Sequence, residues 1–114
     1  MELEAYQLVI LRRPPTAPDL DEETLDRIQA DHLDYLGALR AAGRIVTNGP
    51  VLDQQDESLR GLVFYCVGSV EEARALAERD PAVAAGRLAV EAMTWWCPAG
   101  SMTVPGRQVR LDGD

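Results

Sequence analysis

Hydrophobic residues gather in four short segments of this chain, and the β-branched and aromatic residues among them predict β-strands. The segments span residues 4–13, 44–51, 59–68 and 87–97. Residues 14–18, with the sequence PPTAP, follow the first segment and predict a loop, because proline fits neither a helix interior nor a central strand. We expect Asn48-Gly49-Pro50 to break the second strand, since this sequence is typical of turns.

The spacing of apolar residues predicts a long amphipathic helix between the first two strands. Apolar side chains recur there at intervals of three and four, and the only histidine of the chain belongs to the same stripe: Leu25, Ile28, His32, Leu36 and Leu39. We expect the helix to run from about residue 20 to Ala42, with Asp19 and Glu22 as a capping pair at its start. Gly43 is the residue that ends it.

A second, shorter helix is predicted between the third and fourth strands. The sequence from Ser69 to Glu72 is a capping box, and small and apolar residues then recur on one face. Asp80-Pro81 interrupts this helix, and residues 82–86 are expected to form a short turn. The order of elements is therefore βαββαβ, which predicts an α+β, ferredoxin-like fold with two helices on one face of a four-stranded antiparallel sheet.

One domain is expected over residues 1–97, followed by a C-terminal tail or arm over residues 98–114. A chain of 114 residues, 46% of them hydrophobic, is long enough for one core. The last segment differs, because it contains three glycines and two prolines among scattered charges.

Both faces of the predicted strands are apolar. In the first strand Leu8 and Ile10 point one way, while Val9 and Leu11 point the other. Two helices can cover only one face, so the other would expose several hundred Å² of apolar surface, more than a soluble monomer usually carries. The pattern therefore predicts a homodimer that packs sheet against sheet.

The charge of the chain excludes several partners. The net charge is −8, and all eleven basic residues are arginine, so we expect neither nucleic acid nor an anionic membrane to bind. The N-terminus is acidic, and no apolar stretch approaches the ~20 residues of a membrane span. With no secretion signal, Cys66 and Cys97 are interpreted as reduced thiols of a cytoplasmic protein.

His32 has two interpretations. A histidine on an apolar helix face is commonly a core or boundary residue whose ring bonds to a nearby carbonyl. Alternatively, His32 lines a pocket between the helix and the sheet and serves as a general acid or base, because imidazole titrates near neutral pH. Asp31 and Asp34 flank it in sequence but do not share its face of the helix.

Asp80 also has two interpretations. Asp followed by Pro is a common helix start, in which the carboxylate caps the backbone. A capping aspartate keeps one oxygen free, however, and Asp80 could orient the His32 ring if the fold brings them together.

Other chemistry has little support in the residues. One histidine and two distant cysteines form no zinc pattern, and the acidic clusters lack the spacing of calcium loops, so we expect no metal. Nucleotide-binding glycine motifs and a nucleophile elbow are missing from the sequence, and we expect no cofactor. Trp95 and Trp96 pack in the core or dimer face, or one of them covers an aromatic ligand.

Four stretches of the sequence together resemble the YCII-related (YciI-like) family of the dimeric α+β barrel superfamily. They are HLDYLGAL, GRIVTNGPV, GLVFYCVGSVEEARALAERDPAVAAG and VEAMTWW, and the resemblance extends from about residue 5 to 97. It implies a ferredoxin-like protomer, a dimer formed through the sheets, and a cleft between helices and sheet. It also implies a His-Asp active site, which falls on His32 and Asp80.

The resemblance implies a function as well. Relatives include a dehydrochlorinase of chlorinated aromatic compounds, and the superfamily contains muconolactone isomerases. By analogy the chain is a cofactor-independent lyase or isomerase, in which His32 moves a proton on a small carbonyl or enol substrate. Asp80 then sets the tautomer of His32. The alternative is a non-catalytic homodimer that binds a small ligand or supports another protein, and a cofactor-free oxygenase is a third possibility.

Candidate substrate-binding residues accompany this pair. They are Arg27, Gly49, Pro50 and Trp95. Arg27 stands near the place where relatives carry an arginine before the histidine, and Arg12 is a second candidate for holding an anion. Position 82 is alanine, whereas many relatives have an aromatic residue there.

Overall fold

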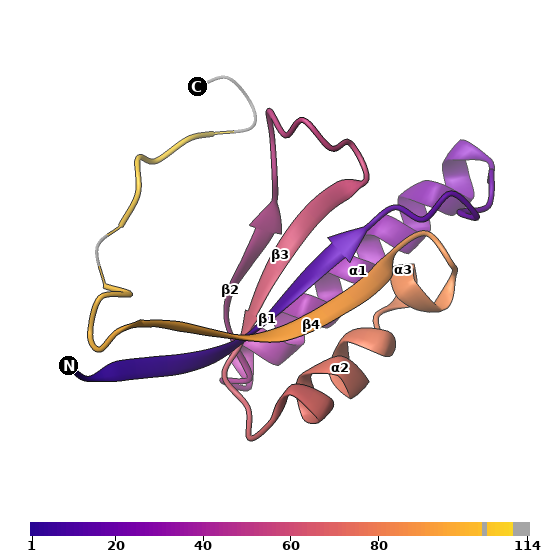
Figure 1. Ribbon diagram of the computed structural model, residues 1–114. Coiled ribbons are helices and arrows are strands. Elements are labelled where there is room, and N and C mark those ends of the chain that lie inside the picture. Colours follow the sequence, from indigo (N-terminus) through magenta and orange to yellow (C-terminus); the bar gives the residue numbers. More distant parts are fainter. Residues whose placement is uncertain (104, 111–114) are drawn as a thin grey trace.

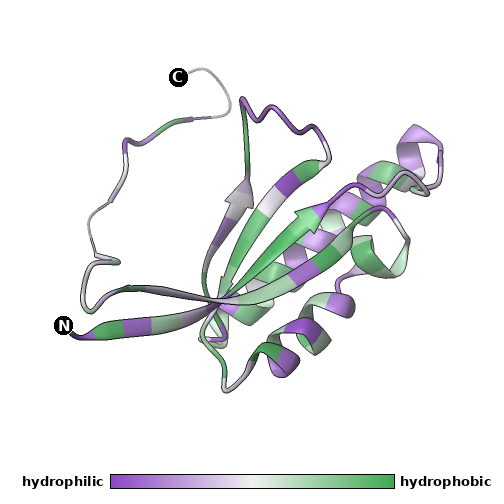
Figure 2. Ribbon diagram, in the orientation of Figure 1, coloured by the Kyte–Doolittle hydropathy of each residue, from purple (hydrophilic) through white to green (hydrophobic). Residues whose placement is uncertain are grey.

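The four predicted strands pair into a single antiparallel sheet of order β2-β3-β1-β4 (Figure 1). A computed structural model describes residues 1–103 and 105–110. The strands are β1 (Leu3–Arg12), β2 (Ile45–Pro50), β3 (Leu59–Tyr65) and β4 (Ala89–Pro98). The central pair β1 and β3 is the most apolar part of the sheet (Figure 2).

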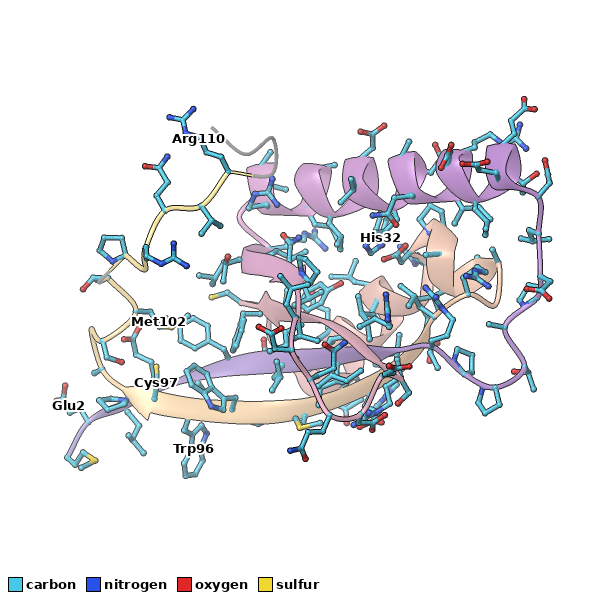
Figure 3. The ribbon with its side chains drawn as sticks, turned by 90° about the horizontal axis from the view of Figure 1, so that it is seen from above. Glu2, His32, Trp96, Cys97, Met102 and Arg110 are labelled. Carbon is cyan, nitrogen blue, oxygen red and sulfur yellow. The ribbon has the colours of Figure 1, made fainter. Side chains whose placement is uncertain are left out.

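Three helices lie on one face of this sheet (Figures 1 and 3). They are α1 (Glu22–Ala41), α2 (Val70–Glu78) and α3 (Pro81–Ala84). The hydroxyl of Ser69 caps α2 as predicted, accepting a hydrogen bond of 3.1 Å from the Glu72 backbone N–H. Gly43, at φ 77°, follows the end of α1 in the left-handed conformation that glycine adopts without strain. The fold is α+β and ferredoxin-like, as predicted.

The core lies between the helices and the inner face of the sheet. Its largest fully buried apolar side chains come from β1 and β3 and include Val9, Val63 and Tyr65. From α1, Leu36 is buried and the other residues of the predicted stripe are partly buried, so the stripe faces the sheet as expected.

Three local predictions were wrong. The helix cap at the start of α1 is Asp21, not Asp19, and the acidic Glu22 and Glu23 that follow it favour a helix start there. Residues 81–84 form the one-turn helix α3, where a turn was expected, because Asp80 caps that turn and Pro81 fits its first position.

The third error concerns β2, which Asn48-Gly49-Pro50 does not break. These residues pair with Val63, Leu62 and Gly61 of β3. Proline is tolerated because β2 is an edge strand, where its missing N–H removes no ladder bond. Gly61 allows the close approach, since a Cβ there would lie 3.1 Å from the Gly49 carbonyl oxygen.

The outer face of the sheet, away from the helices, is also apolar. Because directly paired residues share a face, the register assigns to it the charged Glu91, which pairs with Ile10, and a set of alternating apolar side chains: Tyr6, Leu8, Ile10, Leu62, Phe64, Met93 and Trp95. Trp95 packs edge to face against Phe64, with ring centroids 5.2 Å apart. We call these apolar residues the outer apolar face.

Beyond β4, residues 99–103 and 105–110 form neither helix nor strand. The division of the chain into a domain over residues 1–97 and a tail or arm over residues 98–114 stays a prediction.

Cys66 and Cys97 are free thiols. In the described part of the chain, no helix combines the length and the apolar character of a membrane span.

Candidate active site

A cavity of about 340 Å³ lies between α1 and the sheet. His32 and Leu36 of α1 line one side, and Gly49 and Pro50 of β2 line the other. Leu11 and Val63 contribute apolar surface from β1 and β3. Cavities of this size and composition accommodate small organic molecules.

His32 and Asp80 are in direct contact at this cavity. The Nδ1 atom of His32 lies 2.6 Å from Oδ2 of Asp80, although the residues are 48 positions apart. The His32 side chain is 12% exposed and that of Asp80 is 1% exposed. With Asp80 ionised, its carboxylate can only accept, so this contact requires Nδ1–H of His32 as the donor. The neutral ring therefore keeps an unprotonated Nε2, which can take up a proton.

Asp80 makes both of the contacts that its two interpretations require. Its Oδ1 atom accepts a hydrogen bond of 2.9 Å from the Ala82 backbone N–H and so caps α3. Its Oδ2 atom is then left for His32. The cap fixes the carboxylate, and the carboxylate in turn fixes the orientation of the imidazole.

Two tyrosines lie near this pair in the interior. The Tyr35 hydroxyl donates a hydrogen bond of 2.6 Å to the Leu76 carbonyl. The Tyr65 hydroxyl is buried and has no hydrogen-bond partner among the described residues. Burial raises the pKa of Tyr65, and the nearby charges of Tyr35 and Asp80 raise it further.

Replacing Tyr65 with phenylalanine is expected to raise the free energy of unfolding by about 1 kcal/mol, because the variant removes a buried hydroxyl without a partner. The gain should grow above about pH 10, where the unfolded chain loses the phenolic proton before the folded protein does. Urea unfolding of both proteins at neutral and alkaline pH measures the difference. A less stable Tyr65→Phe variant at neutral pH would contradict the reasoning.

The structure brings together some of the predicted site residues and separates others. Gly49 and Pro50 line the cavity with His32. Arg27 is exposed on α1 and does not line it. Trp95 belongs to the outer apolar face and packs against Phe64.

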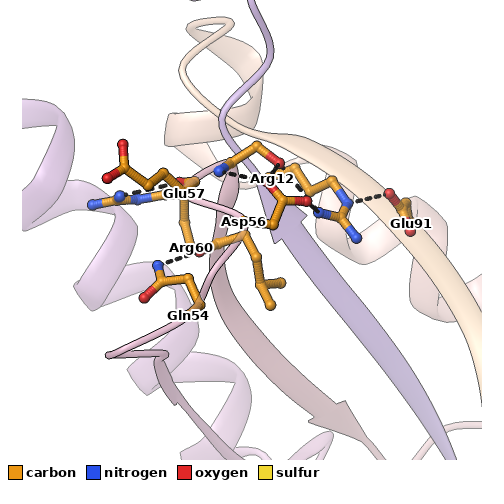
Figure 4. Close-up of polar contacts among 8 residues, drawn as sticks. Arg12, Gln54, Asp56, Glu57, Arg60 and Glu91 are labelled. Atoms are coloured by element: carbon orange, nitrogen blue, oxygen red, sulfur yellow. Dashed lines mark hydrogen bonds and ion pairs between the residues drawn. The ribbon is translucent and has the colours of Figure 1, made fainter.

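Arg12 is engaged in ion pairs elsewhere. Its Nε atom lies 2.5 Å from Glu91, and Nη1 lies 3.0 Å from Asp56 (Figure 4). The hydrogen bond to Glu91 raises the pKa of the Arg12 guanidinium. Arg12 is therefore not free to hold a ligand in the described conformation.

Sequence reasoning missed two cavity arginines, Arg13 and Arg60. The alternation of β1 could have indicated the first, because Arg13 continues the spacing of the buried Val9 and Leu11. No comparable signal marks Arg60, because in the alternation of β3 it shares the spacing of Leu62 and Phe64 and not that of the buried Val63 and Tyr65.

Fold and site together define a ferredoxin-like α+β protein with a small-molecule-sized cavity beside a histidine–aspartate contact. A family model, the YCII-related domain, matches residues 7–96. The chain therefore belongs to the YCII-related family.

Among solved structures, the chain is similar to 5-chloro-2-hydroxyhydroquinone dehydrochlorinase (TftG) from Burkholderia phenoliruptrix AC1100, in complex with 2,5-dihydroxybenzoquinone. The sequences are 22% identical, and the match covers 79% of this chain and 90% of that one, with a TM-score of 0.56. This likeness establishes the shared fold. A comparison with curated proteins gives no match.

Proposed function

We propose that this protein is a cofactor-independent lyase or isomerase that acts on a small cyclic carbonyl or enol compound. The observation that carries the proposal is the 2.6 Å contact between His32 and the buried Asp80 at the wall of the cavity. His32 is the general base and acid, and Asp80 is its positioning residue.

The proposed chemistry is a proton transfer. Nε2 of His32 removes a proton from a hydroxyl or from a carbon beside a carbonyl, and the electron pair moves into the ring system. In an elimination from a chlorinated ring, the proton is delivered to the carbon that carries chlorine, and the electron pair of a second deprotonated hydroxyl then expels chloride; in an isomerisation the proton returns at another carbon. The imidazolium formed in between is stabilised by the Asp80 carboxylate.

The similar solved structure supports this choice of substrate class. It is a dehydrochlorinase in complex with 2,5-dihydroxybenzoquinone, a small ring with carbonyl and hydroxyl groups. A cavity of about 340 Å³ has room for such a ring. Its apolar lining suits the faces of a planar ring.

We also propose that the protein is a homodimer joined through its outer apolar face. The three helices cover the opposite face of the sheet, so a second copy would remove these side chains from water.

The test of the proposed function is catalysis by the purified protein without added cofactor. Chlorinated hydroxyhydroquinones are assayed for chloride release, and cyclic diketones and lactones for exchange of carbon-bound hydrogen in deuterated water. We expect catalysed release or exchange that His32→Gln abolishes. Binding of these compounds without any reaction would contradict the proposal and favour a ligand-binding protein.

A further inference from the structure

The cavity beside His32 carries positive charge on one side. Arg13 and Arg60 both line it, and both come from the ends of central strands, just after β1 and at the start of β3. Gln29 and Asn48 are further polar residues of the lining. One part of the cavity is thus basic and polar, while the rest is largely apolar.

These two arginines have no carboxylate partner in the described part of the chain. The ion pairs found there are those of Arg12 with Asp56 and Glu91 and that of His32 with Asp80. The contrast with Arg12, which is adjacent in sequence to Arg13, is visible in Figure 4, where Arg12 reaches two carboxylates. This difference is notable in a chain with 19 acidic residues and a net charge of −8.

Each of the two guanidinium groups is only partly used by the protein. Nε of Arg13 donates to the Arg87 carbonyl at 2.9 Å. Nη1 of Arg60 donates to the Glu57 carbonyl at 3.4 Å. A guanidinium has five N–H donors, so both side chains retain donors for a ligand.

The electrostatics of this cluster favour an anionic ligand. Burial lowers the pKa of Arg13, and the positive charges of Arg87 and Arg60 lower it further. Arg87 itself donates to the Pro18 carbonyl at 2.8 Å. Three guanidinium groups therefore lie near one another, and among the described residues their hydrogen bonds go to backbone carbonyls, so a bound anion would relieve their repulsion.

We propose that Arg13 and Arg60 form a subsite for the carboxylate of a small cyclic acid bound in this cavity. The planar guanidinium matches a carboxylate through paired hydrogen bonds. This subsite rests on the proposed function and extends it. The carboxylate holds the ring so that its reacting carbon lies against His32. The substrate class is thereby narrowed to ring compounds with an acid group.

The experiment compares two probes that differ in charge. They are 2,5-dihydroxybenzoate and hydroquinone, which share a dihydroxylated ring but only the first of which has a carboxylate. Binding is measured by calorimetry and by the shift of the His32 ring resonances. We expect the carboxylate probe to bind at least about tenfold more tightly to the wild type, and added salt to weaken that preference.

Variants assign this preference to the two arginines. Arg13→Gln and Arg60→Gln should each weaken binding of the carboxylate probe about tenfold and leave hydroquinone binding unchanged. Arg74→Gln, at an exposed position of α2, is the matched control and should change neither affinity. Arg60 is exposed, so its variant keeps the test valid if Arg13→Gln disturbs the fold. Arg13→Lys retains the charge and should lose less affinity than Arg13→Gln.

Equal affinity for the two probes, no binding of either, or unchanged affinity in both glutamine variants would overturn the subsite. Failure of the subsite can be distinguished from failure of the proposed function. Arginine-dependent binding without turnover of any compound would leave the subsite standing while the function fails. Turnover of uncharged rings that depends on His32 but not on Arg13 or Arg60 would overturn the subsite and leave the proposed function standing.

Discussion

Replacing His32 with glutamine is expected to lower kcat/KM for the proton-transfer reaction by a factor of about 10²–10⁴, the usual contribution of a positioned acid–base residue. Glutamine can still bond to Asp80, but its amide cannot accept and return a proton at neutral pH. The side chain is only 12% exposed, yet it lies at a cavity wall, where a side chain of similar size fits. Steady-state kinetics of the folded variant give the ratio.

Asp80→Asn tests the positioning role in the same assay. Asparagine caps helices well, so α3 should persist. If the amide oxygen keeps the Ala82 N–H, the amide nitrogen faces Nδ1 of His32 and favours the opposite tautomer. We expect a loss of at least about tenfold in kcat/KM, with little loss of stability. Wild-type kinetics in either variant would exclude the pair as the catalytic centre.

A glutamate in place of Leu8 is expected to convert a dimer into a monomer, with the dissociation constant raised at least about 100-fold. Leu8 lies on β1 and pairs with Phe64 of β3 and Met93 of β4, near the middle of the outer apolar face. A carboxylate buried there between two sheets would lose its water without gaining a partner. Sedimentation velocity over a range of concentrations measures the assembly.

Leu52→Glu is the matched control, because Leu52 is 80% exposed in the loop after β2. It introduces the same charge away from the outer apolar face and should leave the dimer intact. A wild-type protein that sediments as a monomer, or a Leu8→Glu variant that remains a dimer, would refute the proposed interface.

Much of this fold follows from patterns that a single sequence displays. The stripe from Leu25 to Leu39 specified the inner face of α1, and the box from Ser69 to Glu72 specified the start of α2. The error at Asn48-Gly49-Pro50 had a tertiary cause. Local preference indicates a turn there, but pairing with Val63, Leu62 and Gly61 extends the strand to Pro50.

The candidate site was less accessible from sequence. His32 and Asp80 could be selected as candidates, but only the packing of α1 against α3 brings their side chains to 2.6 Å. Arg27 was selected from its place in the sequence before His32, but it is exposed and does not line the cavity, whereas Arg13, just after β1, does. Distances between elements depend on the whole core, and no local spacing encodes them.

The tautomer of His32 shows most directly whether Asp80 holds this ring in the form that can accept a proton at Nε2. Nitrogen chemical shifts of the imidazole can be recorded above neutral pH, and the assignment is unambiguous because His32 is the only histidine. We predict a protonated Nδ1 and an unprotonated Nε2 in the wild type, and a shift toward protonated Nε2 in Asp80→Asn. A wild-type ring protonated at Nε2, or a tautomer that ignores Asp80→Asn, would contradict the role assigned to this pair.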